Sequence, residues 1–265
     1  MTILDQLAEH ARERVAKAKQ VISEEEMKAK ALALHEAGET EDFRFEKALR
    51  KQGISFICEC KKASPSKGLI AEYFPYTAIA KACEEAGADC ISVLTEPKWF
   101  LGSDRYLEEI VQTVSIPCLR KDFTVDPYMI YEAKVLGASA VLLICSILTE
   151  EELQSFHAIA DSLGLSALVE THDEAEVETA LRIGARIIGV NNRNLKDFSV
   201  DTGNSKRLRE RIPKEVLFVS ESGVKDAADV AVLREIGADA VLIGETLMRA
   251  EDKTAKLAEL KGNPA

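Results

Sequence analysis

The stretches EEAGADCISVLT (84–95) and LREIGADAVLIG (233–244) follow one pattern, in which a helix-like segment ends at glycine and a β-branched run begins soon after. The pattern occurs twice more, in KVLGASAVLLI (134–144) and LRIGARIIGV (181–190). Glycine is favoured just after a helix because it adopts the left-handed backbone conformation without strain at a Cβ. The four glycines stand about 50 residues apart, which leaves room in each interval for two strand-and-helix units of about 25 residues.

Eight apolar runs of strand length fit this spacing. They are SFICECK (55–61), CISVL (90–94), PCLRK (117–121), AVLLIC (140–145), SALVE (166–170), IIGVN (187–191), VLFVSES (216–222) and AVLIG (240–244). Near-continuous apolar runs are typical of parallel strands that are covered on both faces, and helical patterns such as 151–163 and 173–183 lie between them. Eight strands that alternate with helices predict an α/β fold, a (β/α)₈ TIM barrel. An open, doubly wound sheet is the alternative, but eight evenly spaced units favour closure.

Residues 1–52 precede the first strand and form a separate helical pattern. The segment ILDQLAEHARERV (3–15) places apolar residues on one helical face, and DFRFEKALRKQG (42–53) predicts a second short helix. We therefore expect a helical N-terminal extension that could cover one end of the barrel. No Pro/Ser-rich linker separates it, so residues 1–265 are interpreted as a single domain. We expect a monomer, with a dimer as the alternative, since the apolar residues of these helices could cover a second subunit instead.

Composition excludes several classes of function. Of the 265 residues, 46% are hydrophobic and 30% are charged, as in ordinary globular proteins, and the formal net charge is −11. An acidic surface repels phosphates, so nucleic acid is not expected as a partner. No apolar run approaches the roughly 18 residues that span a membrane, so no membrane partner is expected either. The first residues lack the apolar centre of a signal peptide, and a cytoplasmic location is predicted.

The six cysteines form no Cys-x-x-Cys pair, and five of them lie in or beside apolar segments. The pair Cys58-Glu-Cys60 could suggest a metal site, but zinc sites need three or four ligands and the sequence shows no partners. We expect buried, reduced thiols and no bound metal.

Polar residues stand at the ends of most predicted strands, where a (β/α)₈ barrel builds its active site. They are Glu59 with Lys61, Lys121, Glu170, Asn191 with Arg193, and Glu221 with Ser222. Alternation along the first strand puts Glu59 and Lys61 on one face and Cys58 and Cys60 on the other. Three other charged residues are assigned to the surface or to loops: Lys62, Lys67 and Asp122. Burying two lysines and three glutamates close together is costly, so the cluster indicates acid–base chemistry rather than a structural rim.

A phosphate site is predicted at the last two strands. Ser222-Gly223 follows the seventh strand and Gly244-Glu245 follows the eighth. Barrels often bind phosphate through backbone N–H groups of these two loops, and glycine lets the backbone approach the anion closely. We therefore expect a small phosphorylated molecule as the partner of this chain.

The motifs at the strand ends resemble those of the indole-3-glycerol phosphate synthase family of tryptophan biosynthesis. They are ECKKASPS (59–66), SVLTEPKWFLGS (92–103), LRKDF (119–123) with VDPY (125–128), ALVETH (167–172), IGVNNRNL (188–195), SESGV (220–224) and LIGETLM (242–248). The resemblance covers essentially the whole chain. It implies a (β/α)₈ barrel that uses no metal and no organic cofactor. The implied reaction converts 1-(2-carboxyphenylamino)-1-deoxyribulose 5-phosphate into indole-3-glycerol phosphate, CO₂ and water.

The resemblance also implies roles for the acid–base residues. Lys121 matches the general acid of ring closure, a task for which we expect its pKa to be brought toward neutrality by burial or by a neighbouring cation such as Lys61. Glu59 and Glu170 match catalytic carboxylates of the later steps, and Lys61 is a second candidate acid for dehydration. Which of these three groups moves which proton stays open.

The remaining matches concern two further catalytic residues, Asn191 and Glu221, and the residues that bind substrate. Asn191 is expected to orient the substrate hydroxyls and Glu59. The other expected contacts are Ser64 and Arg193 at the anthranilate carboxylate, Glu221 and Ser222 as site residues of the seventh strand, and Gly223, Gly244 and Lys61 at the phosphate. Glu245 should offer only its backbone N–H, because its carboxylate would repel phosphate. Phe100 and Leu142 either pack on the aromatic ring or are plain core residues.

Two other functions are considered. A different sugar-phosphate isomerase or epimerase would need only one acid–base pair, which leaves two lysines and three glutamates unexplained. A barrel that binds phosphate without activity would be indicated by loss of Glu59, Lys61, Lys121 or Glu170, and all four are present.

Overall fold

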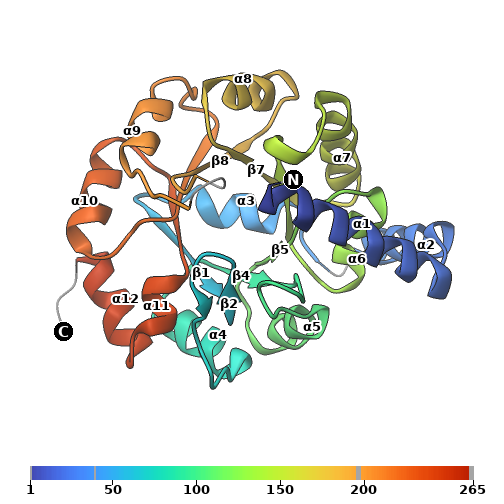
Figure 1. The fold of residues 1–265 in the computed structure, drawn as a ribbon, viewed down its shortest axis with the longest axis horizontal. Helices are drawn as coiled ribbons and strands as arrows, with labels where there is room; N and C mark the ends of the chain where they lie inside the picture. The colour runs from blue at the N-terminus through green and yellow to red at the C-terminus, as the bar shows by residue number, and fades with distance from the viewer. Residues whose placement is uncertain (1, 39, 195–197, 263–265) are drawn as a thin grey trace.

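The computed structural model describes residues 2–38, 40–194 and 198–262. Eight parallel strands form a closed barrel (Figure 1): β1 (Ser55–Cys60), β4 (Cys90–Leu94), β5 (Cys118–Lys121), β6 (Ala140–Ile144), β7 (Ser166–Thr171), β8 (Ile187–Asn191), β9 (Leu217–Glu221) and β10 (Ala240–Ile243). The sheet closes because β1 pairs with β10, with Ser55 aligned to Ala240. The predicted barrel is confirmed, the open sheet is excluded, and each strand ends within one residue of its predicted limit.

Helices follow the strands and surround the barrel (Figure 1). They are α4 (Tyr76–Glu85), α5 (Asp104–Thr113), α6 (Pro127–Val135), α7 (Glu150–Ser162), α8 (Glu174–Arg182), α9 (Gly203–Arg209), α10 (Ala227–Glu235), α11 (Glu245–Arg249) and α12 (Lys253–Lys261), with a short 3₁₀ turn η1 (Cys145–Ile147) before α7. The glycines of the repeated pattern have the expected left-handed backbone, with φ of 83°, 83°, 77° and 74° at Gly87, Gly137, Gly184 and Gly237. The loop after β1 contains a small hairpin, β2 (Ala63–Ser64) with β3 (Gly68–Leu69), which the sequence pattern does not predict.

The apolar core has two layers. An inner cluster fills the barrel and includes Ile57, Leu119, Leu142 and Leu168. An outer cluster lies between strands and helices, and it takes Cys58 and Cys60 from β1. The alternation expected for β1 is therefore confirmed, since the cysteines pack under the helices while Glu59 shares the face of Ile57.

The N-terminal extension forms three helices, of which α3 and α1 cover opposite ends of the barrel: α1 (Ile3–Val21), α2 (Glu24–Glu36) and α3 (Arg44–Leu49). In Figure 1, α3 lies across the middle of the ring of strands, and Phe45 and Leu49 join the inner cluster. The backbone N–H of Glu46 in α3 donates to Ser166 Oγ, and Ser166 is the first residue of β7. Helix α3 therefore lies at the end of the barrel where the strands begin. Helix α2 packs against α6. Helix α1 lies at the opposite end, where the strands finish.

Five of the six cysteines are buried and unpaired, and Cys145 is partly exposed. Burial raises the pKa of the Cys60 thiol well above its usual value, so the thiol form persists in the core. Within the described residues, no helix combines the length and the apolar character that a membrane crossing requires.

Candidate active site

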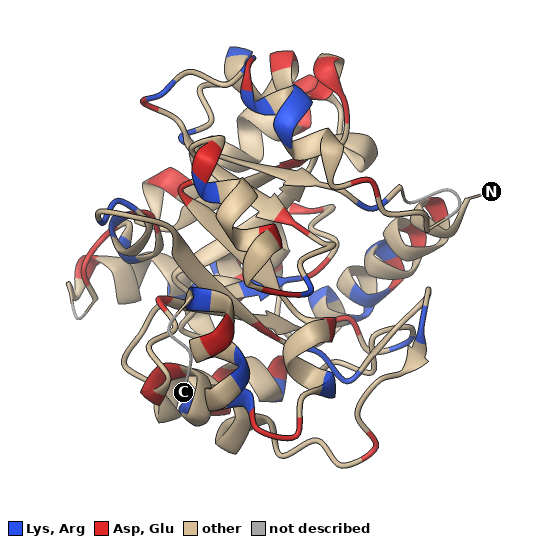
Figure 2. Cartoon of the chain, turned by 90° about the vertical axis from the view of Figure 1, so that its left-hand side faces the viewer, with Lys and Arg blue, Asp and Glu red and all other residues tan. Residues whose placement is uncertain are grey.

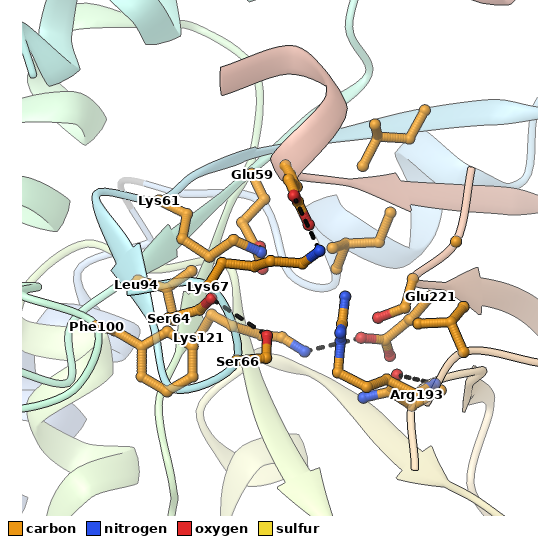
Figure 3. Close-up of a pocket in the computed structure, with 18 of the residues that line it drawn as sticks. Glu59, Lys61, Ser64, Ser66, Lys67, Leu94, Phe100, Lys121, Arg193 and Glu221 are labelled. Atoms are coloured by element: carbon orange, nitrogen blue, oxygen red, sulfur yellow. Dashed lines mark hydrogen bonds and ion pairs between the residues drawn. The ribbon is translucent and has the colours of Figure 1, made fainter. Parts of the chain in front are cut away.

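The polar strand ends meet at one mouth of the barrel. They surround a cavity of about 680 Å³ whose lining includes Glu59, Lys61, Lys121, Glu170, Asn191 and Glu221. In Figure 3, Glu59, Lys61, Lys121 and Glu221 reach into the same space, Glu59 and Lys61 from the end of β1, Lys121 from β5 and Glu221 from β9. The sequence-based expectation of one acid–base cluster is thus matched by the geometry. Elsewhere the acidic and basic side chains are interspersed over the surrounding helices (Figure 2).

Lys121 lies at the centre of the cluster. Its Nζ is 3.0 Å from Glu170 Oε2 and 2.7 Å from Glu221 Oε2. Burial alone would lower the pKa of Lys121, but these two carboxylates outweigh it and raise the pKa above its ordinary value. The expectation of a pKa near neutrality is therefore wrong in this structure. Lys61, the cationic neighbour expected for Lys121, lines the same cavity and pairs its Nζ with Glu59 Oε1 at 2.6 Å.

The two carboxylates that hold Lys121 differ in their surroundings. Burial opposes the charge of Glu170, but Lys121 and then His172 outweigh it and lower the pKa of Glu170. Burial dominates at Glu221 and raises the pKa of that carboxyl to about 7. Among the described residues, Glu221 Oε1 has no hydrogen-bond partner. Two neighbouring carboxyls whose pKa values are pushed apart can serve as acid and base at one pH.

Asn191 contacts Glu170 rather than Glu59. Its Nδ2 donates to Glu170 Oε1 at 3.2 Å, and its Oδ1 accepts from the backbone N–H of Arg193 at 3.0 Å. The expectation that Asn191 orients Glu59 is therefore wrong in this structure. Because Asn191 ends β8 and Glu170 lies in the neighbouring strand β7, the contact follows from the strand order.

Glycine is required beside Glu59 and Lys61. A Cβ at Gly244 would lie 2.8 Å from Lys61 Nζ and closer still to Glu59 Oε1. A side chain at position 244 would therefore displace this ion pair. Gly223 has φ of 97°, and a Cβ there would lie 2.7 Å from Thr202 Cγ2. Both glycines line the cavity, as the predicted phosphate site requires.

Glu245 directs its side chain along the helix that it begins. Its Oε1 is 3.1 Å from Arg249 Nε and 3.6 Å from Lys67 Nζ. The carboxylate thus has two cationic partners, in keeping with the expectation that only its backbone faces an anion. Lys67, which the sequence pattern leaves in a surface loop, lines the same cavity.

The other predicted binding residues also line this cavity: Ser64, Phe100, Leu142, Arg193 and Ser222. Phe100 packs against Phe123 with ring centroids 6.0 Å apart. Leu142 belongs both to the lining and to the inner core. Arg193 Nη1 donates to the carbonyl of Phe198 at 3.2 Å.

Some residues of the mouth escape sequence reasoning. Ile3, Leu4 and Leu7 of α1 line the cavity, although the amphipathic pattern shows only that one face of α1 is buried, not against what. Asp122 is buried, not at the surface as expected, because Arg14 of α1 binds both of its oxygens. His172 is also missed, although alternation after Glu170 could have placed it near that carboxylate.

Comparison with known proteins agrees with this geometry. A family model described as indole-3-glycerol phosphate synthase matches residues 4–260. The indole-3-glycerol phosphate synthase of Ruminiclostridium cellulolyticum is 57% identical over 261 residues, which cover 98% of this chain and 99% of that protein. That of Endomicrobium trichonymphae is 52% identical over 260 residues, with coverage of 98% and 99%.

Solved structures with low identity share the fold alone. The 3-hexulose-6-phosphate synthase of Salmonella typhimurium aligns with a TM-score of 0.66 at 14% identity. The alignment covers 79% of this chain and 97% of that one.

Proposed function

The chain belongs to the indole-3-glycerol phosphate synthase family, and on that premise we propose how its residues carry out the reaction. It is a carbon–carbon lyase of tryptophan biosynthesis. The reaction closes a ring in 1-(2-carboxyphenylamino)-1-deoxyribulose 5-phosphate, releases CO₂ and removes water, leaving indole-3-glycerol phosphate. The observation that carries the assignment of roles is the position of Lys121, held between Glu170 and Glu221 at the centre of the mouth.

Lys121 acts as the general acid of ring closure. The aromatic carbon that bears the carboxylate attacks the ketone, and the ketone oxygen gains negative charge. A developing alkoxide is more basic than an amine, so an ammonium with a raised pKa can still donate its proton to it. The fixed positive charge also stabilises that oxygen before the proton moves. Glu221 and Glu170 hold the ammonium in place.

Glu59 and Lys61 carry out dehydration. Decarboxylation returns an electron pair to the ring, and the hydroxyl formed in the first step must then leave as water. Lys61 protonates this hydroxyl, and Glu59 removes the ring proton. The two groups lie 2.6 Å apart, so Glu59 can return its proton to Lys61 and the pair ends each turnover as it began.

The substrate is held at its two anionic ends. Backbone N–H groups of Gly223 and Gly244 bind the phosphate, together with Lys61. Ser64 and Arg193 bind the anthranilate carboxylate, and Phe100 packs on the aromatic ring. These assignments are supported by the shared cavity and by the close approach that both glycines allow.

We propose that the protein works as a single-domain monomer in the cytoplasm and needs no metal or cofactor. The apolar face of α1 supports a monomer, since Leu7, Ala8, Ala11 and Val15 are buried against the barrel of the same chain. This face is therefore not left open for a second subunit.

A fluorescence assay tests the proposal. Purified protein is mixed with the substrate in the absence of metal, and indole emission is followed over time. We expect product with the wild type and with Lys214→Ala, a control lysine that is exposed. Lys121→Ala should lower turnover by about 10²–10⁴-fold while substrate binding largely persists, since general acids typically contribute that much. Wild-type protein that forms no product would overturn the proposed function, and near-normal turnover in Lys121→Ala would overturn the role of Lys121.

A further inference from the structure

The two oxygens of Glu170 face different surroundings. Oε2 faces Lys121 Nζ at 3.0 Å, toward the centre of the mouth. Oε1 faces away from Lys121, where Asn191 Nδ2 lies at 3.2 Å and His172 Nε2 at 3.4 Å. One carboxylate therefore lies between the general acid and a histidine that the reaction, as proposed above, does not use.

His172 is held by a second carboxylate on its outer side. Its Nδ1 lies 3.1 Å from Glu176 Oε2 and 3.1 Å from Ser146 Oγ. Ser146 donates to the other oxygen of Glu176 at 2.6 Å, so Nδ1–H is the donor to both groups. The remaining nitrogen, Nε2, is buried and has no hydrogen-bond partner within the described parts of the chain, although it faces Glu170 at ion-pair distance.

These three groups lead from the buried site toward solvent. The exposed fraction of the side chain is 3% for Glu170, 16% for His172 and 20% for Glu176. His172 and Glu176 line a second cavity, which shares Asn191 and Arg193 with the mouth. A proton could thus enter from this second cavity without passing through the substrate.

The charges around the ring favour its protonated form. Burial opposes the imidazolium, but Glu176 and Glu170, with Glu221 beyond them, outweigh it and raise the pKa of His172. From α9, Asn204 donates to the His172 carbonyl and contacts no ring nitrogen. The other charged residues of the second cavity come from α1, the loops and α9: Asp5, Asp173, Arg193, Asp201 and Arg207.

The chemistry requires a proton from outside. One proton goes to the ketone oxygen and a second leaves with the hydroxyl as water, whereas only one is released when the indole double bond forms. The carboxylate departs as neutral CO₂, so each turnover takes up one proton. Because Glu59 can restore Lys61, the missing proton is the one that Lys121 gave up.

Resting on the proposed function, we propose that His172 is a positioning residue that acts through Glu170 and supplies the proton that restores Lys121. The Nε2–H bond breaks as an O–H bond forms on Glu170. The carboxyl group then turns and donates this proton to the Lys121 amine. The neutral ring regains a proton from solvent in the second cavity, and Glu176 keeps the ring oriented.

Rapid mixing of enzyme with excess substrate tests this relay. Lys121 starts protonated, so the first turnover does not depend on His172. In His172→Gln, which keeps an N–H near Glu170 but cannot carry the proton, we expect the first turnover within twofold of the wild type. Later turnovers should be at least tenfold slower. In His172→Ala, added imidazole should accelerate those later turnovers. His35→Gln, a histidine of α2 remote from the mouth, should change neither phase.

The outcomes separate the relay from the reaction. If His172→Gln slows the first and later turnovers equally, or leaves all of them within twofold of the wild type, the relay is wrong. Glu176→Gln provides a second variant should the His172 variants fail to fold, and it should slow only the later turnovers; unchanged later turnovers there would also overturn the relay. Wild-type protein that forms no indole product would overturn the proposed function instead.

Discussion

Arg14 of α1 binds both carboxylate oxygens of Asp122, the residue that follows Lys121 in the chain. The guanidinium nitrogens lie 2.6 and 3.1 Å from these oxygens, although 108 positions separate the two residues in sequence. Burial opposes the charge of Asp122, but Arg14 outweighs it and lowers the pKa of this carboxyl. The extension is therefore attached directly after β5, the strand that ends at Lys121, the proposed general acid.

Replacing Arg14 should destabilise the fold. Arg14→Met leaves Asp122 buried without its charge partner, and breaking such a pair costs about 3 kcal/mol of unfolding free energy. Urea denaturation measures this, with Arg12→Met as control, because Arg12 is half-exposed and its pair with Glu9 should contribute less than about 0.5 kcal/mol. Equal unfolding free energies for the two variants would refute a structural role for the buried pair.

Gly223→Val should weaken phosphate binding. The backbone at this position has φ of 97°, and the new Cβ would lie 2.7 Å from Thr202 Cγ2, so the loop must move. We expect the Kd for a phosphate-bearing ligand, measured by calorimetry, to rise at least tenfold, on the order of 1.4 kcal/mol. Gly184→Ala is the control, since the φ of Gly184 is also positive but the added Cβ would meet no atom within 4 Å. An unchanged Kd in Gly223→Val would remove Gly223 from the phosphate site.

Gly244→Ala should impair dehydration. The added methyl group would push Lys61 and Glu59 apart, because its Cβ would lie 2.8 Å from Lys61 Nζ. Loss of a positioned acid–base pair typically lowers the rate by about 10²-fold or more. Rapid-quench analysis should show accumulation of the ring-closed, decarboxylated intermediate before indole appears. A normal rate with no intermediate would contradict the role of this pair.

Glu221 should make the fold less stable as pH rises from about 4.5 to 7. Burial raises its pKa to about 7, so in this window the folded chain holds a proton that the unfolded chain has lost. The stability contributed by this proton is lost once the pH exceeds about 7, an effect of roughly 1–3 kcal/mol. Urea denaturation at pH 5 and pH 8 measures the loss.

Glu221→Gln is the matched variant for this measurement. Its amide cannot titrate, so the fall in stability between pH 5 and pH 8 should be smaller than in the wild type by about the same 1–3 kcal/mol. An identical fall in both proteins would show that Glu221 keeps an ordinary pKa. Glu170 has a lowered pKa and therefore stays ionised between pH 5 and pH 8. Its contribution to the free energy of unfolding is thus the same at both pH values.

The sequence predicts most of the barrel because its signals are local. A glycine after every second helix or so, together with apolar runs of strand length, is sufficient to locate each of the eight barrel strands within one residue. Alternation likewise separates Glu59 from Cys58 and Cys60 without any knowledge of their neighbours. The polar strand ends then converge because parallel strands of a closed barrel finish at the same mouth.

The features that escape prediction depend on residues far apart in the chain. The pKa of Lys121 is raised by Glu170 and Glu221, which lie 49 and 100 positions away. The burial of Asp122 depends on Arg14 in the same manner. No pattern within one segment reports such distances, so the sequence identifies the charged groups but not the pairs they form.

The pairing of β1 with β10 has a consequence for synthesis of the chain. Ser55 meets Ala240 only after the intervening residues have been made, which takes roughly 10–40 s at the usual 5–20 residues per second. During this time one edge of β1 has no strand beside it, and the apolar interior of the unfinished barrel is open to water. The nascent chain therefore passes through an incomplete barrel that is prone to aggregation, because it has an unpaired strand edge and an exposed apolar interior. Its yield in cells should depend on translation speed and on chaperones that shield that edge.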